Sequence, residues 1–328
     1  MSALLGLRWW QHVLEQPLTK NKPEIILTVQ SGDGLGTVLR QLSASGHVKY
    51  PRLTRLWAKW TELDRGLQVG EYRLDRKTNL KQLLQMLNKG QVIRYGVTLP
   101  EGITLAQALA ILHATPELSA SIDGVGDPKL AELTEYPGHP EGWFLPETYF
   151  FVRGDSDADI LARANLLMRE ALNDAWQSRD DGLPLANPYE VLILASIVER
   201  ETSVPAERES IAGVFVRRLK KGMRLQTDPS VIYGLGENYK GNLRRSHLRD
   251  DKNPWNTYRI PGLPPTPIAL PGKEALNATV HPGQGRDLYF VAKGDGYHAF
   301  AETLEAHQSN VQRYQLQRRA DYRSTPVK

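Results

Sequence analysis

The most constraining feature of the sequence is a helix that is apolar on nearly every side. Residues 189–198 read Tyr-Glu-Val-Leu-Ile-Leu-Ala-Ser-Ile-Val, and at 3.6 residues per turn their apolar side chains surround the helix axis. Asn187 suits the N-cap position and Pro188 the first helical position, so we expect the helix to begin there. A helix without a polar face is stable only when it is buried, so this segment predicts a domain large enough to enclose it.

Two glutamates, Glu199 and Glu201, end this apolar helix. They are two residues apart, about 200° around the helix, so they face opposite ways and cannot form one acid–base pair. Glu201 continues an apolar row, and apolar neighbours raise a carboxyl pKa toward the range of a general acid. Glu199 continues a row in which the Ser196 hydroxyl is a candidate partner. The pattern favours Glu201 as a catalytic acid, with a salt bridge from either glutamate to Arg200 or Arg208 as the structural alternative.

A repeat organises the first third of the chain. Segments 27–42, 72–87 and 97–112 each combine a short extended run, a polar turn and leucines at helical spacing. A further helix, opened by Pro51, separates the first two segments. The glycines at 32–36 lack the third glycine of a dinucleotide loop, so they indicate a tight turn. Each segment is therefore predicted to be strand, turn and helix.

A length of 328 residues corresponds to about two domains of roughly 150 residues. We therefore expect two folded parts, preceded by a short N-terminal segment. Residues 24–94 form a small module of βα repeats that resembles LysM domains, which bind cell-wall glycans; a packing or spacing domain is the alternative. Residues 95–328 form a larger mixed α/β domain, which gives an α+β fold class. Residues 1–23 contain an apolar run and paired tryptophans, which indicate the stub of a membrane anchor or a linker, with a frayed terminus as the alternative.

Composition excludes several kinds of chemistry. The chain has no cysteine, which rules out thiol nucleophiles, disulfides and thiolate-bound zinc. His247, His281 and His298 lack the short spacing of metal ligands, so we expect no metal and no other cofactor. The 41 basic and 37 acidic residues are interspersed, and no basic stripe carries aromatic residues, so nucleic acid is not an expected partner.

Polar and aromatic side chains cluster on proline-punctuated segments after the repeat. Glu141 and Glu147 stand among aromatic residues, an arrangement that suits sugar rings and hydroxyls, with an apolar hairpin as the alternative. Amide, hydroxyl and carboxyl groups at 222–234 and 256–258 also suit a sugar better than a metal or phosphate. The candidate substrate-binding residues are Glu141, Glu147, Gln226, Asp228, Tyr233, Asn256 and Tyr258.

Several ordered strings make the chain resemble a known family, the MltG (YceG-like) endolytic murein transglycosylases of bacteria. The resemblance covers almost all of the chain from about Glu24. The strings are Glu-Gly-Trp-Phe-x-Pro at 141–146, Ala-Ser-Ile-x-Glu-x-Glu-Thr at 195–202, Gly-Met-Arg-Leu-Gln-Thr-Asp-Pro at 222–229, Asn-Thr-Tyr at 256–258, Gly-Leu-Pro-Pro at 262–265 and Leu-Tyr-Phe-Val-Ala at 288–292.

The resemblance implies a LysM-like N-terminal part, a catalytic domain and cleavage within nascent peptidoglycan strands. It maps the family's catalytic glutamate onto Glu201, in agreement with the helix pattern. It also implies a location at the periplasmic face of the inner membrane through an anchor that this chain lacks, with cell-wall synthases as further expected partners. The competing interpretation is a non-catalytic protein that binds peptidoglycan and serves the synthesis machinery as a scaffold.

Overall fold

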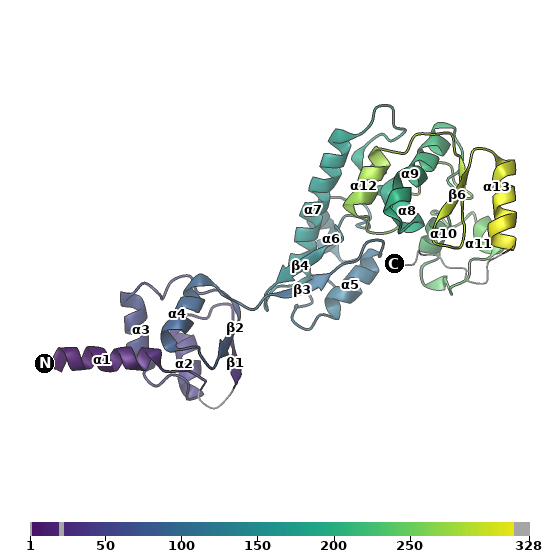
Figure 1. Cartoon of the computed structure of the whole chain (residues 1–328). Coiled ribbons are helices and arrows are strands. Elements are labelled where there is room, and N and C mark those ends of the chain that lie inside the picture. The colour runs from purple at the N-terminus through teal and green to yellow at the C-terminus, as the bar shows by residue number, and fades with distance from the viewer. Residues whose placement is uncertain (1, 20–22, 318–328) are drawn as a thin grey trace. The chain divides into compact units, whose positions relative to one another are not determined.

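A computed structural model describes residues 2–19 and 23–317, and contacts within the chain divide it into two compact units (Figure 1). The first unit comprises Met1–Val97, Leu112–Ser121 and Tyr149–Asp157, and the second comprises Thr98–Ile111, Ile122–Thr148 and Ala158–Lys328. The mixture of helices and strands confirms the predicted α+β class. The predicted boundaries at 23/24 and 94/95 and the likeness to LysM domains stay predictions.

The first unit contains a two-stranded antiparallel sheet with helices beside it. Strand β1 (Glu24–Val29) pairs with β2 (Gly70–Asp75), in a register that sets Glu24 opposite Asp75 and Val29 opposite Gly70. Each strand leads through a turn into a helix, as the repeat predicts, and Asn79 forms a capping box with Gln82 at the start of the second of these helices. The helices are α1 (Ser2–Glu15), α2 (Leu35–Ala44), α3 (Pro51–Trp60) and α4 (Leu80–Lys89).

The remaining elements confirm the third repeat and the apolar helix predicted to begin at Pro188. Strand β3 is followed by α5, and β3 pairs with β4 in a second two-stranded sheet. The elements in chain order are β3 (Tyr95–Thr98), α5 (Leu105–His113), α6 (Pro128–Thr134), β4 (Thr148–Phe151), α7 (Asp157–Ser178), α8 (Pro188–Glu201), α9 (Pro205–Lys220), α10 (Asp228–Leu235), a 3₁₀ turn (Gly236–Asn238), α11 (Arg245–Arg249), α12 (Lys273–Val280), β5 (Tyr289–Ala292), β6 (His298–Ala301), α13 (Leu304–Val311) and a π-helical turn (Gln312–Leu316).

Helix α8 is the central element of the second unit, as its apolar sequence predicts. The Asn187 side chain accepts a hydrogen bond from the Glu190 amide at 3.1 Å, and Pro188 is the first helical residue. All residues from Val191 to Val198 are buried. Helices α9, α10 and α12 pack against α8, and Figure 1 shows α9 and α12 beside it. The helix therefore delivers its last residue, Glu201, from the hydrophobic core outward.

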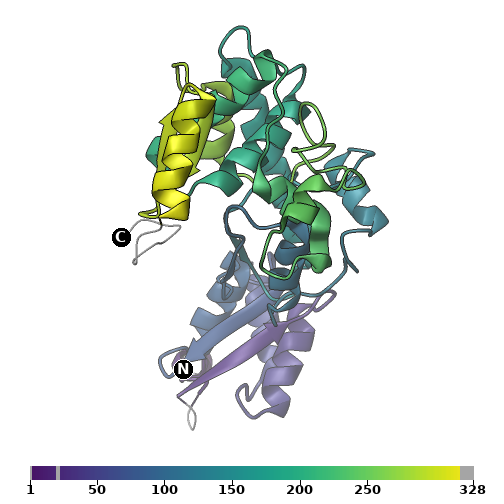
Figure 2. The same ribbon diagram turned by 90° about the vertical axis from the view of Figure 1, so that its right-hand side faces the viewer.

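The C-terminal part of the second unit is a β-hairpin covered by a helix. Strands β5 and β6 are antiparallel, with Tyr289 opposite Ala301 and Ala292 opposite His298. Helix α13 lies across one face of this hairpin (Figure 2). The Phe290 ring is 5.7 Å from the Phe215 ring of α9, so the hairpin is anchored to the core by aromatic packing.

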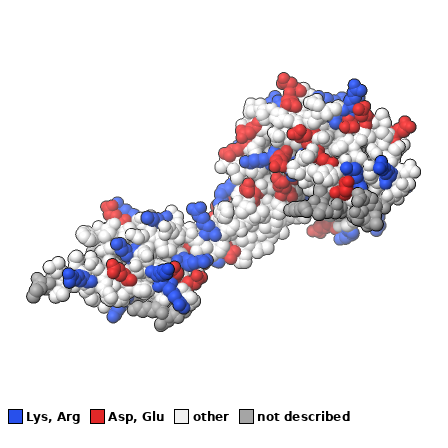
Figure 3. Space-filling view, viewed as in Figure 1, with Lys and Arg blue, Asp and Glu red and all other residues white. Residues whose placement is uncertain are grey.

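The surface carries both signs of charge, as the sequence composition predicts. On the face drawn in Figure 3, basic and acidic side chains are intermingled over both units. Among residues 2–19 and 23–317, no helix combines the length and apolar character that crossing a bilayer requires.

Candidate functional site

Glu201, the last residue of α8, lies on the wall of a cleft of about 590 Å³ in the second unit. The rest of the lining comes from α9, from residues 225–228 at the start of α10, from Tyr258, and from the β5–β6 hairpin with α13 and the π-helical turn that follows it. Polar and aromatic groups face this space, among them Arg218, Gln226, Asp228 and Tyr289. An acid at the edge of an apolar core therefore opens onto a concave surface rich in hydrogen-bonding groups.

The environment of Glu201 raises the pKa of its carboxyl group into the neutral range. The pKa of Glu201 is raised to about 7, chiefly by burial and to a lesser degree by the Asp228 carboxylate. The Thr227 hydroxyl, which donates to Oε1 of Glu201, and the guanidinium groups of Arg218 and Arg200 act in the opposite direction. Because burial is the largest of these causes, Glu201 has the pKa of a general acid that works close to pH 7.

Two segments that the sequence singles out, 222–234 and 256–258, are joined by hydrogen bonds beside Glu201. The Thr227 amide donates to the Thr257 hydroxyl at 3.0 Å, and that hydroxyl lies 2.9 Å from the Ser230 hydroxyl. The Tyr258 hydroxyl donates to Oδ1 of Asp228 at 2.7 Å. These contacts hold Tyr258 and Asp228 together at the cleft, where both line the wall.

Gln226 adopts a backbone conformation that is unusual for its residue type. Its φ of 54° lies in the left-handed region, which costs a non-glycine residue about 1 kcal/mol or more. Its amide donates to the Thr257 carbonyl at 3.2 Å, and its Oε1 accepts from Arg218 at 3.4 Å. These two contacts hold Gln226 in place, and its side chain faces the cleft beside Arg218.

Four of the eight predicted site residues line the cleft, and four do not. Glu201, Gln226, Asp228 and Tyr258 line the cleft together. Glu147 is exposed, and its carboxylate accepts from the amide of the next residue at 2.8 Å. The remaining three, Glu141, Tyr233 and Asn256, are held by contacts outside the cleft lining.

Glu141, which is buried, and Tyr233, which is half-buried, form a hydrogen-bonded pair. The Leu105 amide donates to Oε1 of Glu141 at 2.8 Å, so this carboxyl group caps the first residue of α5. The Tyr233 hydroxyl donates to Oε2 at 3.1 Å. Burial raises the pKa of Glu141 to about 7, as it does for Glu201. Of these two glutamates only Glu201 lines the cleft, so a raised pKa alone does not identify the acid.

Asn256 is fully buried and organises the loop that carries Tyr258. Its Nδ2 donates to the carbonyls of His247 at 3.1 Å and Asp250 at 2.6 Å, and its Oδ1 accepts from the Tyr258 amide at 3.1 Å. These contacts use the side chain's donors and acceptor within the loop. The geometry therefore gives Asn256 a role in shaping the cleft through Tyr258.

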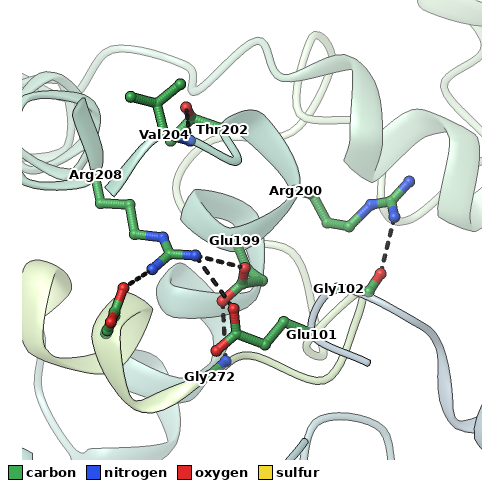
Figure 4. Close-up of polar contacts among 9 residues, drawn as sticks. Glu101, Gly102, Glu199, Arg200, Thr202, Val204, Arg208 and Gly272 are labelled. Atoms are coloured by element: carbon green, nitrogen blue, oxygen red, sulfur yellow. Dashed lines mark hydrogen bonds and ion pairs between the residues drawn. The ribbon is translucent and has the colours of Figure 1, made fainter. Parts of the chain in front are cut away.

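Glu199 points away from the cleft, as its position on the helix predicts. Its partner, however, is not the Ser196 hydroxyl that the sequence suggests. Ser196 donates to the Ile193 carbonyl at 2.7 Å and accepts from the Ile268 amide at 3.0 Å, so its hydroxyl is occupied within the core. Glu199 instead pairs with Arg208 at 3.4 Å (Figure 4). The salt-bridge alternative is thus confirmed for Glu199.

The sequence patterns missed Arg218, which lines the cleft and is only 7% exposed. Its guanidinium donates to the carbonyls of Leu288 at 2.6 Å and Leu225 at 2.7 Å, and lies 5.1 Å from the centre of the Tyr289 ring. A signal was present, because Arg218 follows Ile211, Val214 and Phe215 on the apolar face of α9. A cation on an apolar helix face indicates a buried polar site.

A larger cavity, of about 710 Å³, lies in the first unit. Hydroxyl, amide and imidazole side chains contribute to its lining, including Gln16, Ser43 and His47. Among the described residues that line it, none carries a carboxylate, so this cavity lacks the acid that the cleft of the second unit contains. We therefore take the smaller cleft as the candidate active site.

Comparison with known proteins gives one consistent result. The model of the YceG-like family matches residues 27–313. An endolytic murein transglycosylase of Bacillus subtilis is 29% identical over 322 residues, covering 92% of this chain and 88% of the relative. An endolytic murein transglycosylase of Streptococcus pneumoniae is 25% identical over 342 residues, covering 93% of this chain and 62% of the relative. A crystal structure of a YceG-like protein from Listeria monocytogenes matches 88% of this chain and 99% of its own, with a TM-score of 0.54 and 28% identity.

Proposed function

Because the chain belongs to the YceG-like family, we propose that it is an endolytic transglycosylase that cleaves the bond between MurNAc and GlcNAc within murein glycan strands. The observation that carries this proposal is Glu201, a carboxyl group with a pKa of about 7 on the wall of a polar and aromatic cleft. A non-catalytic scaffold has no need for such an acid. Cell-wall synthases, which make the strands, remain expected partners.

The proposed mechanism uses Glu201 first as an acid and then as a base. The protonated carboxyl group donates its proton to the glycosidic oxygen as the bond to C1 of MurNAc breaks, which releases the GlcNAc hydroxyl. The resulting carboxylate takes the proton of the C6 hydroxyl of MurNAc as that oxygen bonds to C1. The product end is a 1,6-anhydro ring, and Glu201 is protonated again. Since the nucleophile belongs to the substrate, the second carboxylate of ordinary glycosidases is unnecessary.

The other residues of the cleft suit recognition of the sugar. Tyr258 and Asp228 present hydroxyl and carboxylate groups, and Gln226 presents an amide. Tyr289 also lines the cleft, where its ring stacks with that of His307 at 5.2 Å. Arg218 supplies a fixed positive charge near Glu201, which stabilises the carboxylate that proton donation creates.

Product analysis tests the proposed reaction. Long glycan strands incubated with the protein should yield shorter oligosaccharides that end in 1,6-anhydroMurNAc, as identified by mass spectrometry. Reducing ends in place of anhydro ends would show hydrolysis. Release of disaccharides alone would show cleavage from strand ends instead of endolytic cleavage.

Replacing Asp228 by asparagine should move the pH dependence of cleavage. Asp228 raises the pKa of Glu201, so Asp228→Asn lowers that pKa, and Glu201 loses its proton at a lower pH. The decline of the rate with rising pH should then begin at lower pH, which a profile of kcat/KM measures. Asp174→Asn on α7, an equal change of charge at an exposed position outside the cleft lining, is the control and should leave the profile in place. An unchanged profile for Asp228→Asn would contradict the electrostatic coupling.

We further propose that the protein works at the periplasmic face of the bacterial inner membrane, with the first unit against the lipid. Helices α1 and α3 form an apolar groove of about 490 Å³ lined by Trp9, Trp10, Leu53, Leu56, Trp57 and Trp60. Trp60 is 81% exposed and Leu56 66% exposed. Exposed basic residues flank the groove at Arg52, Arg55 and Lys59, and α3 contains no acidic residue. Tryptophans with cations are typical of surfaces that lie at lipid headgroups.

Leu56→Ser combined with Trp60→Ser should weaken binding to vesicles that contain phosphatidylglycerol by about tenfold or more, because each large apolar side chain contributes roughly 1.5–3 kcal/mol when buried. Cosedimentation with the vesicles measures this change. Leu166→Ser, which alters a leucine of α7 that is 58% exposed, is the matched control. If the double variant binds the vesicles as well as the unaltered protein does, the groove does not contact lipid. Self-association of the protein through this groove would also contradict the proposal.

A further inference from the structure

Helix α8 ends at Glu201 without the backbone cap that closes other helices of the chain. Thr202, the C-cap residue, is extended, with φ of −145° and ψ of 139°. By contrast, α4 ends at Gly90 in the left-handed conformation, and the Gly90 amide donates back to the last turn. The last four carbonyls of a helix lack partners within it, so an uncapped last turn frays readily. The turn that carries Glu201 therefore needs another means of fixation.

Side chains of the two preceding residues supply that fixation (Figure 4). Oε2 of Glu199 accepts from the Gly272 amide at 2.9 Å, and Oε1 accepts from Nη2 of Arg208 at 3.4 Å. On the next residue, Nη1 of Arg200 donates to the Gly102 carbonyl at 2.8 Å. The last turn of α8 is thus bound to α9 and to two loops, in directions other than the cleft.

The two loops are themselves joined, so the last turn is attached to a fixed frame. The Gly102 amide donates to the Leu270 carbonyl at 2.9 Å, and the Leu270 amide donates to the Ile103 carbonyl at 2.7 Å. A displacement of the last turn of α8 therefore has to break contacts with both loops.

Arg208 is the centre of this arrangement. It is buried and pairs with three carboxylates, those of Glu199, Glu101 and Glu274. The three differ in exposure, since the side chain of Glu199 is 5% exposed, that of Glu101 45% and that of Glu274 66%. Glu199 is the only one of the three on α8. A buried ion pair with hydrogen bonds on both partners fixes geometry more firmly than an exposed pair.

We propose that Glu199, held by Arg208 and the Gly272 amide, is a positioning residue that sets the last turn of α8 and thereby the place of the Glu201 carboxyl group in the cleft. This inference rests on the proposed function, in which Glu201 is the acid. Glu199 itself does not line the cleft, so it acts through Glu201 and not by contact with the sugar. Displacement of a catalytic group by about 1 Å can reduce a rate by about 100-fold.

Glu199→Gln keeps the size of the side chain and removes its charge toward Arg208. We expect kcat on defined glycan oligomers to fall by about 10- to 100-fold with KM nearly unchanged, because the binding groups of the cleft stay in place. Glu274→Gln is the matched control, because it removes another carboxylate from the same guanidinium without touching α8, and it should leave kcat close to that of the unaltered protein. Circular dichroism and the melting temperature report whether each variant is folded.

A second comparison separates positioning from a general loss of folding. In the Glu201→Gln background, Glu199→Gln should not reduce the residual rate further, since the group that it positions is absent. An additive loss would overturn the proposal, as would a kcat for Glu199→Gln equal to that of Glu274→Gln. If Glu199→Gln does not fold, Arg208→Lys takes its place in the test. Lysine keeps the positive charge but cannot form the planar fork of arginine, so we expect the same loss of kcat. Full activity of Glu201→Gln would instead refute the role of Glu201 as the acid, on which this inference rests.

Discussion

Glu201→Gln is expected to lower the rate of glycan cleavage by about 10²- to 10⁴-fold, the usual contribution of a general acid or base. Glutamine has the shape of the protonated carboxyl group but cannot give up or take a proton in this pH range. In the unaltered protein the same requirement makes cleavage slow as pH rises through about 7, the pKa of Glu201. Rates measured on isolated peptidoglycan, with the products identified by mass spectrometry, check both statements.

The variant should lose activity without losing stability. The folded-state pKa of Glu201 is raised above its ordinary value, so folding favours the protonated form, and this contribution to stability is lost as pH rises through about 7. Glutamine has no charged form, so at about pH 8 the free energy of unfolding of Glu201→Gln should equal or exceed that of the unaltered protein. Urea unfolding measures it.

Two further variants define what the result means. Glu190→Gln makes the same substitution near the start of the same helix, outside the cleft lining, and should retain activity. Glu141→Gln tests the other buried glutamate with a pKa of about 7. If Glu201→Gln still cleaves strands to anhydro products, Glu201 is not the acid. If Glu141→Gln has lost cleavage in the same assay, the acid is Glu141.

The helices were predictable from the sequence because their signals are local. Asn187 and Pro188 mark the start of α8, and Pro51 marks the start of α3. Each of these residues acts on the backbone within one turn of its own position. The apolar row of α8 also predicted that Glu201 leaves the core at the end of the helix, since helical periodicity fixes the side on which each residue lies.

The partners of the polar residues were less predictable because they are distant in the sequence. The residue types at Glu141 and Tyr233 suggested a sugar site, yet these two side chains bind each other across 92 positions. The Ser196 hydroxyl suggested a partner for Glu199, but the Ile268 amide, 72 residues away, uses it. Sequence spacing locates side chains on one element, whereas such pairings depend on how several loops pack.

Arg218 also has partners that are distant in the sequence. Of all the substitutions considered, replacing Arg218 has the second largest expected effect. Its guanidinium donates to the Leu225 carbonyl at 2.7 Å on one wall of the cleft and to the Leu288 carbonyl at 2.6 Å on the strand side. Arg218→Met keeps much of the apolar stem but leaves both carbonyls without this donor. Each unsatisfied buried acceptor costs about 1–3 kcal/mol, so we expect the free energy of unfolding to fall by about 2–6 kcal/mol. Urea unfolding followed by tryptophan fluorescence checks this value.

The same substitution should alter the pH dependence of cleavage in the direction opposite to that of Asp228→Asn. Arg218 lowers the pKa of Glu201, so its removal raises that pKa, and the decline of activity should begin at higher pH. The maximal rate should nevertheless fall, because the positive charge that stabilises the Glu201 carboxylate is lost. Arg218→Lys should recover little of the stability, since an ammonium group cannot reproduce the planar fork that reaches both carbonyls. Normal stability together with an unshifted profile in Arg218→Met would show that this buried cation neither joins the walls of the cleft nor acts on Glu201.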